Sequence, residues 1–413
     1  MKTTFTLLAL LLTVAAAAHG QTSPEATAGT AELQYSARYS QSAAFYGGSL
    51  GDSQEAILSG NLNYANGFKR RPLTVTFGGG YNWNIAGTAY GAGPFENFAI
   101  SQGIVGRKWS IQFGDNVSYL KEAPITGFSG EPGTGEPISG SNPTPPSDQS
   151  ILTLNTRTVS NNVNGEYQHN LNFATSLSVG GNSELLRYPD GNGVDSNSQS
   201  ANAGLTRRLN ARNSLSAQYS FTDFSYPGSN SAQPVSSLKA NTILFGFQRQ
   251  WNRRINTSAS VGPEWIGSPD SAVVPSSTRV SGNATVEDQL RFGSANLTYS
   301  HAASAGGGFL PGAEVDTISG GFGRTFEKKM TINLTGGYDR TSALGGLEGI
   351  DSTFGAGMAT MQLSQHFSAF ANYTATNQTS TGASLPSNAL SGLWQMVSFG
   401  IGYTPREKRI KSQ

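Results

Sequence analysis

Histidine is the residue type best suited to acid–base or metal chemistry, and it occurs only four times in 413 residues. His19 lies in a leader segment described below, while His169 and His366 lie in short polar segments where a turn role is expected. His301 follows Ser300 near the end of a predicted strand, so this pair is the one candidate for hydrolytic chemistry. Since the sequence identifies no supporting partner for the pair, it predicts no catalytic residue and no enzymatic activity.

Metal and cofactor sites are not indicated either. Cysteine is absent, which excludes disulfides and thiolate metal sites, and the histidines are too few for a His/Asp cluster. The run Gly320-Gly321-Phe322-Gly323 lacks the strand–loop–helix setting of a phosphate-binding loop. Triplets such as Asn256-Thr257-Ser258 match glycosylation acceptors, but the same spacing places Asn and Ser on one face of a strand. We therefore expect no cofactor and no metal ion.

The N-terminal twenty residues indicate export. Lys2 supplies a positive charge, residues 5–18 are almost entirely apolar, and Ala18-His19-Gly20 provides small residues for cleavage. This order is typical of a secretory signal peptide, and the apolar run is shorter than the about 20 residues that a membrane-spanning helix needs. We expect a signal peptide at residues 1–20 with cleavage before Gln21, followed by a periplasmic segment at residues 21–30.

The composition narrows the class of the mature chain. Only 13% of residues are charged, against about 25% in an ordinary soluble globule. The mean hydropathy of −0.31 and the lack of a second long apolar stretch argue against helical membrane spans. A net charge of +1 gives no general attraction to nucleic acid. The abundance of Gly, Ser, Thr, Asn and aromatic residues favours an all-β protein.

Alternation with a period of two recurs along the chain. Residues 73–85 place apolar side chains such as Phe77 and Trp83 at odd positions and small or polar ones such as Asn82 at even positions. Successive side chains of a strand point to opposite faces, so each segment has one apolar and one polar face. The same alternation occurs in residues 33–39, 170–179, 214–221, 255–265, 330–338 and 393–403.

The connections between these segments alternate between two kinds. The short polar ones are residues 66–72, 106–108, 168–170, 209–213, 250–254, 287–290, 327–329 and 364–366. The longer ones, rich in Gly, Ser and Pro, are residues 86–95, 121–150, 183–196, 226–236, 267–276, 303–313, 342–351 and 378–392. Aromatic residues gather at both ends, for example Trp109 and Trp251 beside short turns and Trp83 and Trp265 toward long loops. Short periplasmic turns, long external loops and two aromatic girdles are typical of outer-membrane barrels.

These features predict one antiparallel transmembrane β-barrel over residues 31–404, with about 18 strands and 16 as the alternative. A basic periplasmic tail is expected at residues 405–413. The last strand, with Val397, Phe399, Ile401 and Tyr403 on one face, is similar to the assembly signal of Gram-negative porins, although Pro405 and the tail continue past it. The mature chain as a whole resembles outer-membrane β-barrel porins, some of which accompany exopolysaccharide export clusters. The resemblance implies location in the outer membrane of a Gram-negative bacterium and contact with the barrel assembly machinery and outer-membrane lipid.

A barrel of this size is too wide for its own side chains to fill. The polar faces of the predicted strands would line its interior with Thr74, Thr76, Asn82, Asn84, Asn170, Asn172, Ser216, Gln218, Asn256, Ser258 and Asn333. Such a neutral polar lumen favours passive diffusion of small hydrophilic solutes. Export of a polysaccharide is the alternative within transport, and a structural or adhesive barrel without a channel is the alternative outside it.

Charge is distributed unevenly between the predicted barrel ends. Basic residues such as Arg70, Arg212 and Lys329 lie at short turns, and acidic residues concentrate in long loops, although Glu287, Asp288 and Glu327 are exceptions. Such sorting could bias which ions enter, or could only keep charge out of lipid. The longest connection, residues 121–150, is expected to fold partly into the lumen as a constriction, with an external disordered loop as the alternative. Its fixed charges would be Glu122, Glu131, Glu136 and Asp148.

Overall fold

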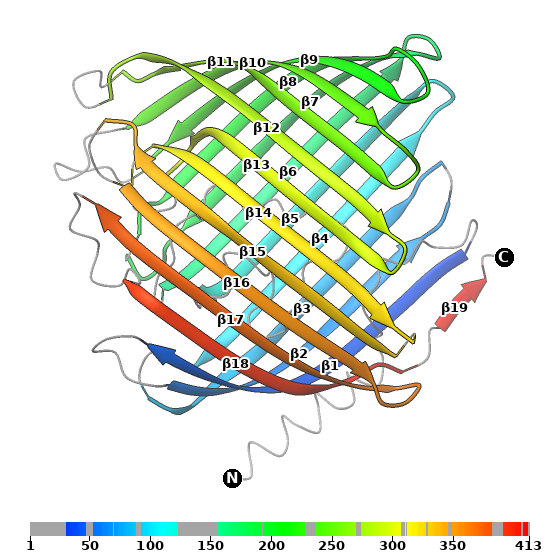
Figure 1. Cartoon of the computed structure of the whole chain (residues 1–413), viewed down its shortest axis with the longest axis vertical. Coiled ribbons are helices and arrows are strands. Elements are labelled where there is room, and N and C mark those ends of the chain that lie inside the picture. The colour runs from blue at the N-terminus through cyan, green and yellow to red at the C-terminus, as the bar shows by residue number, and fades with distance from the viewer. Residues whose placement is uncertain are drawn as a thin grey trace.

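The computed structural model is a single closed β-barrel. It describes residues 30–411 apart from 47–52, 69, 88–91, 123–155, 192, 228–235, 270–273, 307–309, 311, 328, 346–348, 382–390 and 406–407. The strands (Figure 1) are β1 (Thr30–Tyr46), β2 (Ser53–Asn66), β3 (Leu73–Ala86), β4 (Gly93–Val105), β5 (Trp109–Glu122), β6 (Thr156–Asn170), β7 (Thr175–Arg187), β8 (Ser196–Arg208), β9 (Asn213–Ser225), β10 (Ser237–Gln250), β11 (Ile255–Gly267), β12 (Ser277–Leu290), β13 (Gly293–Ser304), β14 (Ala313–Phe326), β15 (Met330–Ala343), β16 (Gly349–Gln362), β17 (Phe367–Thr381), β18 (Gly392–Tyr403) and β19 (Lys408–Lys411).

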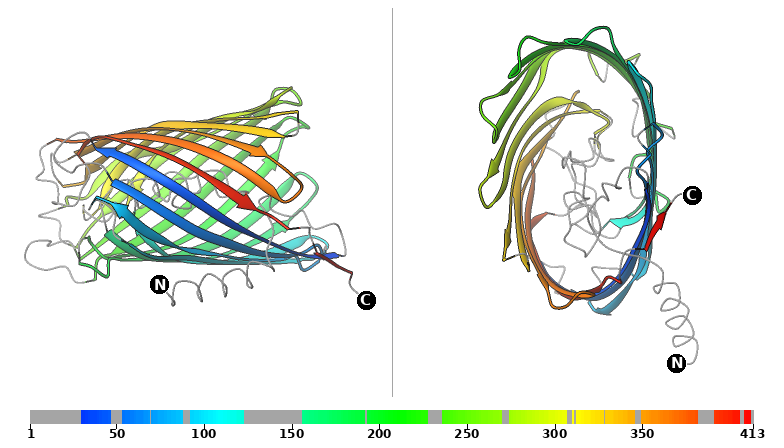
Figure 2. Two further views of the ribbon diagram at one scale, coloured as in Figure 1. Left: turned by 90° about the horizontal axis from the view of Figure 1, so that it is seen from below. Right: turned by 90° about the vertical axis from the view of Figure 1, so that its right-hand side faces the viewer.

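Eighteen strands form the barrel wall, which confirms the predicted fold. From β1 to β18 each strand pairs antiparallel with the next, and β18 pairs with β1 from Ala37↔Tyr403 to Tyr46↔Trp394. Figure 2 shows the resulting oval ring of tilted strands. Closure leaves no unpaired sheet edge in hydrocarbon, where an exposed backbone amide has no hydrogen-bonding solvent. The open choice between 16 and 18 strands is thereby resolved.

The C-terminal residues add a short strand that sequence patterning did not suggest. After β18 ends, β19 pairs with the first residues of β1, from Thr30↔Lys411 to Leu33↔Lys408. The two strands β18 and β19 therefore follow one another along the same edge of β1. The residues predicted as a tail thus contribute backbone pairing at the short-turn end of the barrel.

The outer face of the wall is apolar. Side chains such as Phe77, Phe245, Leu334 and Phe399 are exposed, with Phe245 at 62% and Phe399 at 59%. They lie at alternate strand positions, so they form one face, and hydrocarbon is the solvent that this face requires. Across the described ranges no helix is long and apolar enough to cross a membrane.

The two kinds of connection lie at opposite ends of the barrel, as predicted, but two short turns were placed wrongly. β6 continues through Asn170, so the turn predicted at 168–170 is at 171–174, and β12 continues through Leu290, so the turn predicted at 287–290 is Arg291–Phe292. The strands are also longer than the predicted ten residues, from 12 in β13 to 17 in β1. Strand ends therefore extend beyond the apolar band and carry polar groups outside it.

Candidate functional site

The inner face of the barrel carries most of the residues predicted to line a pore. Ten of the eleven alternate with exposed apolar side chains of their own strand and therefore point inward; they are Thr74, Thr76, Asn82, Asn84, Asn170, Ser216, Gln218, Asn256, Ser258 and Asn333. Asn172 does not belong with them, because it lies in the β6–β7 turn, where its Oδ1 accepts a hydrogen bond from the Ala174 N–H at 2.8 Å. That these ten contact passing solute stays a prediction.

The sequence-based prediction of a neutral wall overlooked carboxylates that point inward. Glu55, Glu264 and Asp339 are 1%, 5% and 2% exposed. Each accepts hydrogen bonds from neutral neighbours: Asn82 donates to Glu55 at 2.5 Å, Thr242 to Glu264 at 3.1 Å, and Thr317 to Asp339 at 3.0 Å. Cross-strand spacing explains these pairs: Thr242 and Thr317 lie directly opposite Glu264 and Asp339, and Asn82 is a diagonal neighbour of Glu55 on the same face. The wall is polar but not free of charged residues.

The ladder between β12 and β13 stops before the strands end. The two strands pair from Leu290↔Gly293 to Gly282↔His301. Beyond that point, residues 277–281 of β12 pair only with β11, and residues 302–304 of β13 pair only with β14. The N–H of Ala303 instead donates to Oε2 of Glu264 in β11 at 3.2 Å. Since Glu264 points inward, the end of β13 lies inside β12, and Figure 2 shows the wall curving inward here.

An apolar cluster holds this inward-turned end of the β13–β14 hairpin, which we call the tucked hairpin end (the described residues of 302–314). The cluster joins the inner faces of β9, β10 and β11 to the connections after β9, β11, β13 and β15, through Phe224, Tyr226, Leu238, Ala240, Ile266, Val274, Ala305 and Leu344. Tyr226 donates from its hydroxyl to the carbonyl of Ala305 at 3.2 Å. Gly312 has a φ of +82°, and a Cβ there would lie 2.6 Å from Leu238 Cδ1. Glycine is therefore required where the connection returns to β14.

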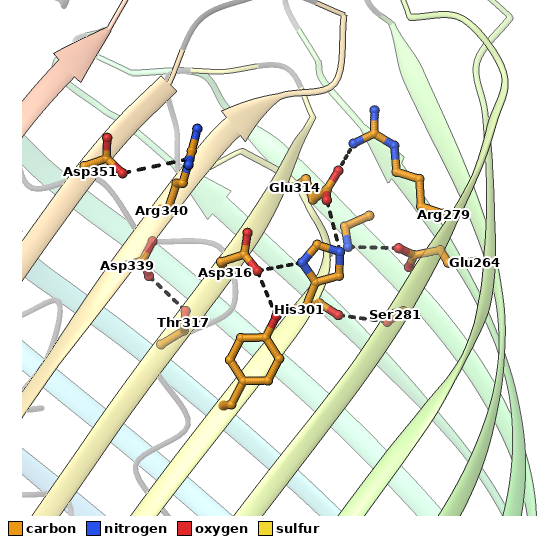
Figure 3. Close-up of polar contacts among 12 residues, drawn as sticks. Glu264, Arg279, Ser281, His301, Glu314, Asp316, Thr317, Asp339, Arg340 and Asp351 are labelled. Atoms are coloured by element: carbon orange, nitrogen blue, oxygen red, sulfur yellow. Dashed lines mark hydrogen bonds and ion pairs between the residues drawn. The ribbon is translucent and has the colours of Figure 1, made fainter.

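A polar cluster fills the space between β12 and the tucked hairpin end (Figure 3). Arg279 of β12 pairs with Glu314 of β14, and His301 Nε2 lies 3.0 Å from Glu314 Oε1. The other ring nitrogen of His301 lies 2.7 Å from Asp316 Oδ1, and Ser281 Oγ donates to the His301 carbonyl at 3.0 Å. The residues come from the inner face of β12 and the outer face of β13–β14, so these side chains replace the missing backbone ladder.

The geometry of His301 does not assemble the Ser/His pair considered from the sequence. Ser300 and His301 are consecutive in β13 and so lie on opposite faces of the sheet. Both ring nitrogens of His301 face carboxylates rather than a hydroxyl nucleophile. Within the described parts of the chain, no group of three or more His, Cys, Asp or Glu is arranged to hold a metal ion. The cluster therefore links β12 to the β13–β14 hairpin through side chains.

Of the predicted constriction loop at residues 121–150, the structure describes only the backbone of the first two residues. Glu122 is the last residue of β5 and pairs with Thr156 of β6. Glu131, Glu136 and Asp148 lie outside the described residues, so their role stays a prediction. Among the described residues, the element that lies across the inner face of the mouth is the tucked hairpin end. Its sequence signal was slight: two glycines, Gly306 and Gly312, flank the connection, and both have positive φ.

Comparison with known proteins gives the fold class and little else. No protein-family model matches the sequence, and no characterised protein gives a significant sequence match. Among solved structures, Pseudomonas aeruginosa OccK2 (OpdF) is similar with a TM-score of 0.50 and 12% identity, over 94% of this chain and 100% of that one. Acinetobacter baumannii OccAB4 gives a TM-score of 0.47 and 8% identity, over 93% and 100% of the two chains. The closed ring of 18 antiparallel strands and the apolar outer face show an outer-membrane β-barrel of porin-like fold.

Proposed function

We propose that the chain is a channel for passive diffusion of small hydrophilic solutes across the outer membrane. The observation that carries the proposal is the pairing of an 18-strand closure with an inner face of Asn, Gln, Ser and Thr. Barrels of 16–18 strands leave room for water, and amide and hydroxyl groups exchange hydrogen bonds with water and with polar solutes at little cost. In this proposal the short turns face the periplasm and the long loops face outward.

The tucked hairpin end supports restriction of the path at the long-loop mouth. Its apolar cluster occupies the inner faces of β9, β10 and β11, so solute would pass beside the inner faces of the remaining strands. The three inward carboxylates, each hydrogen-bonded to an amide or hydroxyl, would leave the wall wettable without a strong field. The proposed substrates are therefore small polar molecules rather than folded polymers, and no catalytic step is required.

Conductance of the purified protein in a planar lipid bilayer tests the proposal. The expected result is stepwise ohmic current that falls when polyethylene glycols small enough to enter the lumen are added. The matched control is the same protein boiled before reconstitution, which should give no steps. A correctly folded barrel that conducts no ions and admits no sugar into liposomes would leave a structural role as the better description. Uptake of a neutral monosaccharide into liposomes provides the independent second measurement.

A further inference from the structure

A cavity at the short-turn end carries an unusual concentration of arginine. It lies where the β8–β9 and β10–β11 turns meet the end of β12, and it has a volume of about 400 Å³. Arg208, Arg212, Arg253 and Arg254 line it, and Glu287 is its one acidic residue. Four cationic groups against one carboxylate leave three positive charges in a small polar space.

Backbone hydrogen bonds fix the turns beside one another. The N–H of Gln250 donates to the carbonyl of Arg212 at 2.8 Å, which joins the β8–β9 turn to the end of β10. The N–H of Gln289 donates to the carbonyl of Arg254 at 2.9 Å, which joins the β10–β11 turn to β12. The arginines are thus brought together by the barrel's own ladder, although they lie up to 46 residues apart in sequence (208 to 254).

Among the residues that the structure describes, these guanidinium groups have no anionic partner. No ion pair forms at Arg212, Arg253 or Arg254 in the described chain, and none joins them to Glu287; Arg208 donates only to the carbonyl of Phe173, at 3.3 Å. Other arginines are differently placed: Arg249 stacks on Trp251 at 4.0 Å, and Arg279 pairs with Glu314. All four arginines are exposed, so solvent screens part of their mutual repulsion, and an oxyanion seated among them would add charge-assisted hydrogen bonds.

Neutral side chains complete the cavity. Gln248, Gln250 and Asn256 line it from the inner faces of β10 and β11. Gln248 donates to Asn256 Oδ1 at 3.4 Å and accepts from Ser214 Oγ at 3.4 Å, and both contacts are long enough for a closer partner to replace them. Guanidinium groups suit carboxylate or phosphate oxygens, and amides suit hydroxyl groups. The cavity therefore offers both kinds of contact to one molecule.

We propose that this cavity, which we call the arginine cavity, binds small solutes that carry a carboxylate or phosphate together with hydroxyl groups. The inference deepens the proposed channel function, since it names the solute class that the short-turn mouth would retain. Keeping charge out of lipid does not account for the arrangement. Arg207, which alternates with exposed Leu205 on the outer face of β8, shows where an arginine lies when it faces the membrane side.

Binding is measured by isothermal titration calorimetry of the full-length barrel in detergent. Glucuronate and glucose form the sharpest probe pair because they share a ring and differ by one carboxylate, and inorganic phosphate tests the second oxyanion. We expect glucuronate and phosphate to bind and glucose not to bind. The triple variant R212Q/R253Q/R254Q should raise the Kd for glucuronate about tenfold or more, as expected for loss of charge-assisted hydrogen bonds.

The matched control is R207Q/R249Q/R291Q, which removes the same charge from the same end. Arg249 and Arg291 lie against Trp251 and Phe292 rather than in the arginine cavity. This variant should leave the Kd within about twofold. Equal weakening by both triple variants, or equal affinity for glucose and glucuronate, would overturn the site. If the glutamine variant does not fold, judged by gel mobility before boiling, R212K/R253K/R254K replaces it and should still weaken binding because it loses the planar fork.

Current recordings then separate the site from the channel. Glucuronate added on the short-turn side should interrupt the current through the wild-type barrel, and the cavity variant should abolish these interruptions. A barrel that binds glucuronate but conducts nothing would refute the proposed channel and leave the site intact. A barrel that conducts but binds neither oxyanion in calorimetry would refute the site and leave the channel intact.

Discussion

The carboxylate of Glu264 in β11 accepts a hydrogen bond from the backbone N–H of Ala303 in β13, across the strand that separates them in the sheet. This contact is possible only because β13 leaves β12 after His301 and turns inward. The Glu264 side chain thus accepts a hydrogen bond from an N–H that has no partner in the β12–β13 ladder. Without this acceptor the partly buried amide would be unpaired, which costs free energy. The Glu264 contact therefore acts beside the apolar and polar clusters that hold the tucked hairpin end, and single substitutions can test its share.

Replacing Glu264 with Ala should loosen the tucked hairpin end without unfolding the barrel. The change leaves the partly buried Ala303 N–H without its acceptor, at a cost of about 1 kcal/mol. We expect more open-channel current noise and a higher mean conductance in planar bilayers, with unchanged gel mobility before boiling. Glu264→Gln keeps an acceptor oxygen and should change both quantities less. Identical recordings for Glu264→Ala and wild type would show that the contact does not hold this end.

Replacing Gly312 with Val should act on the same element through the backbone. A left-handed φ costs a residue with a side chain about 1–2 kcal/mol, and the new Cβ would also meet Leu238 at 2.6 Å. We expect the current noise of the Glu264→Ala variant to be reproduced. Gly355→Ala is the control, because a Cβ at Gly355 meets no atom within 4 Å. Equal behaviour of the two glycine variants would contradict the packing described at Leu238.

The folded barrel should show heat-dependent mobility. A closed ring of 18 strands resists detergent at room temperature because the backbone ladder pairs every strand with both of its neighbours. Extracted in mild detergent, the protein should run anomalously on a gel until it is boiled, and its circular dichroism should be of β type. A helical spectrum, or full solubility without detergent after native expression, would count against the fold.

Separation of charge along the barrel should make the current asymmetric at low salt. Arg212 and Arg254 lie at the short-turn end, and Glu314, Asp316 and Asp351 lie toward the long loops. The current–voltage curve should therefore rectify, with a weak preference for cations entering from the acidic side. Both effects should vanish at roughly 1 M salt, where the screening length is about 3 Å. Strong anion selectivity that persists in molar salt would be the contrary result.

The segment 124–147 gives a separate test of constriction. If it folds into the lumen, replacing it with a short Gly-Ser link should raise single-channel conductance and weaken cation preference, because Glu131 and Glu136 would be removed with it. The conductance of this variant is compared with that of Glu264→Ala, which alters the tucked hairpin end, the other candidate for restricting the channel. Unchanged conductance with intact gel mobility would place the segment outside the path and leave restriction to the tucked hairpin end.

Local patterning predicted the strands well, and its two errors have physical causes. The β6–β7 turn contains Leu171 and Phe173, the latter 91% exposed, so apolar alternation continues through a turn that lacks Gly and Pro. At β12, Glu287 and Asp288 imitate a polar turn although they pair in the ladder. The real turn there has Phe292 flanked by Arg291 and Arg324, whose guanidinium groups lie 5.3 and 5.2 Å from its ring centroid. Turn chemistry at a membrane interface thus differs from the soluble pattern.

The tucked hairpin end and the arginine cavity could not be read from the sequence, because neither depends on local pattern. Glu264 and Ala303 are 39 residues apart, and their contact depends on where a ladder stops. The arginines were visible as basic short-turn residues, but their sharing of one cavity depends on the register of three hairpins. Alternation fixes which face a residue occupies and not which distant residue it meets.

The seam at β1 sets the order in which the barrel can fold. Every other ladder joins strands that are consecutive in the chain, whereas this one joins Ala37 to Tyr403 and Thr30 to Lys411. Closing a loop of that length costs more chain entropy than closing a hairpin, so the hairpins should form early and the seam last. Until then β1 and β18 present open edges that can pair wrongly with another chain. The four residue pairs of β19 lengthen the final ladder. They therefore favour pairing of β1 with its own C-terminal strands over pairing with another chain.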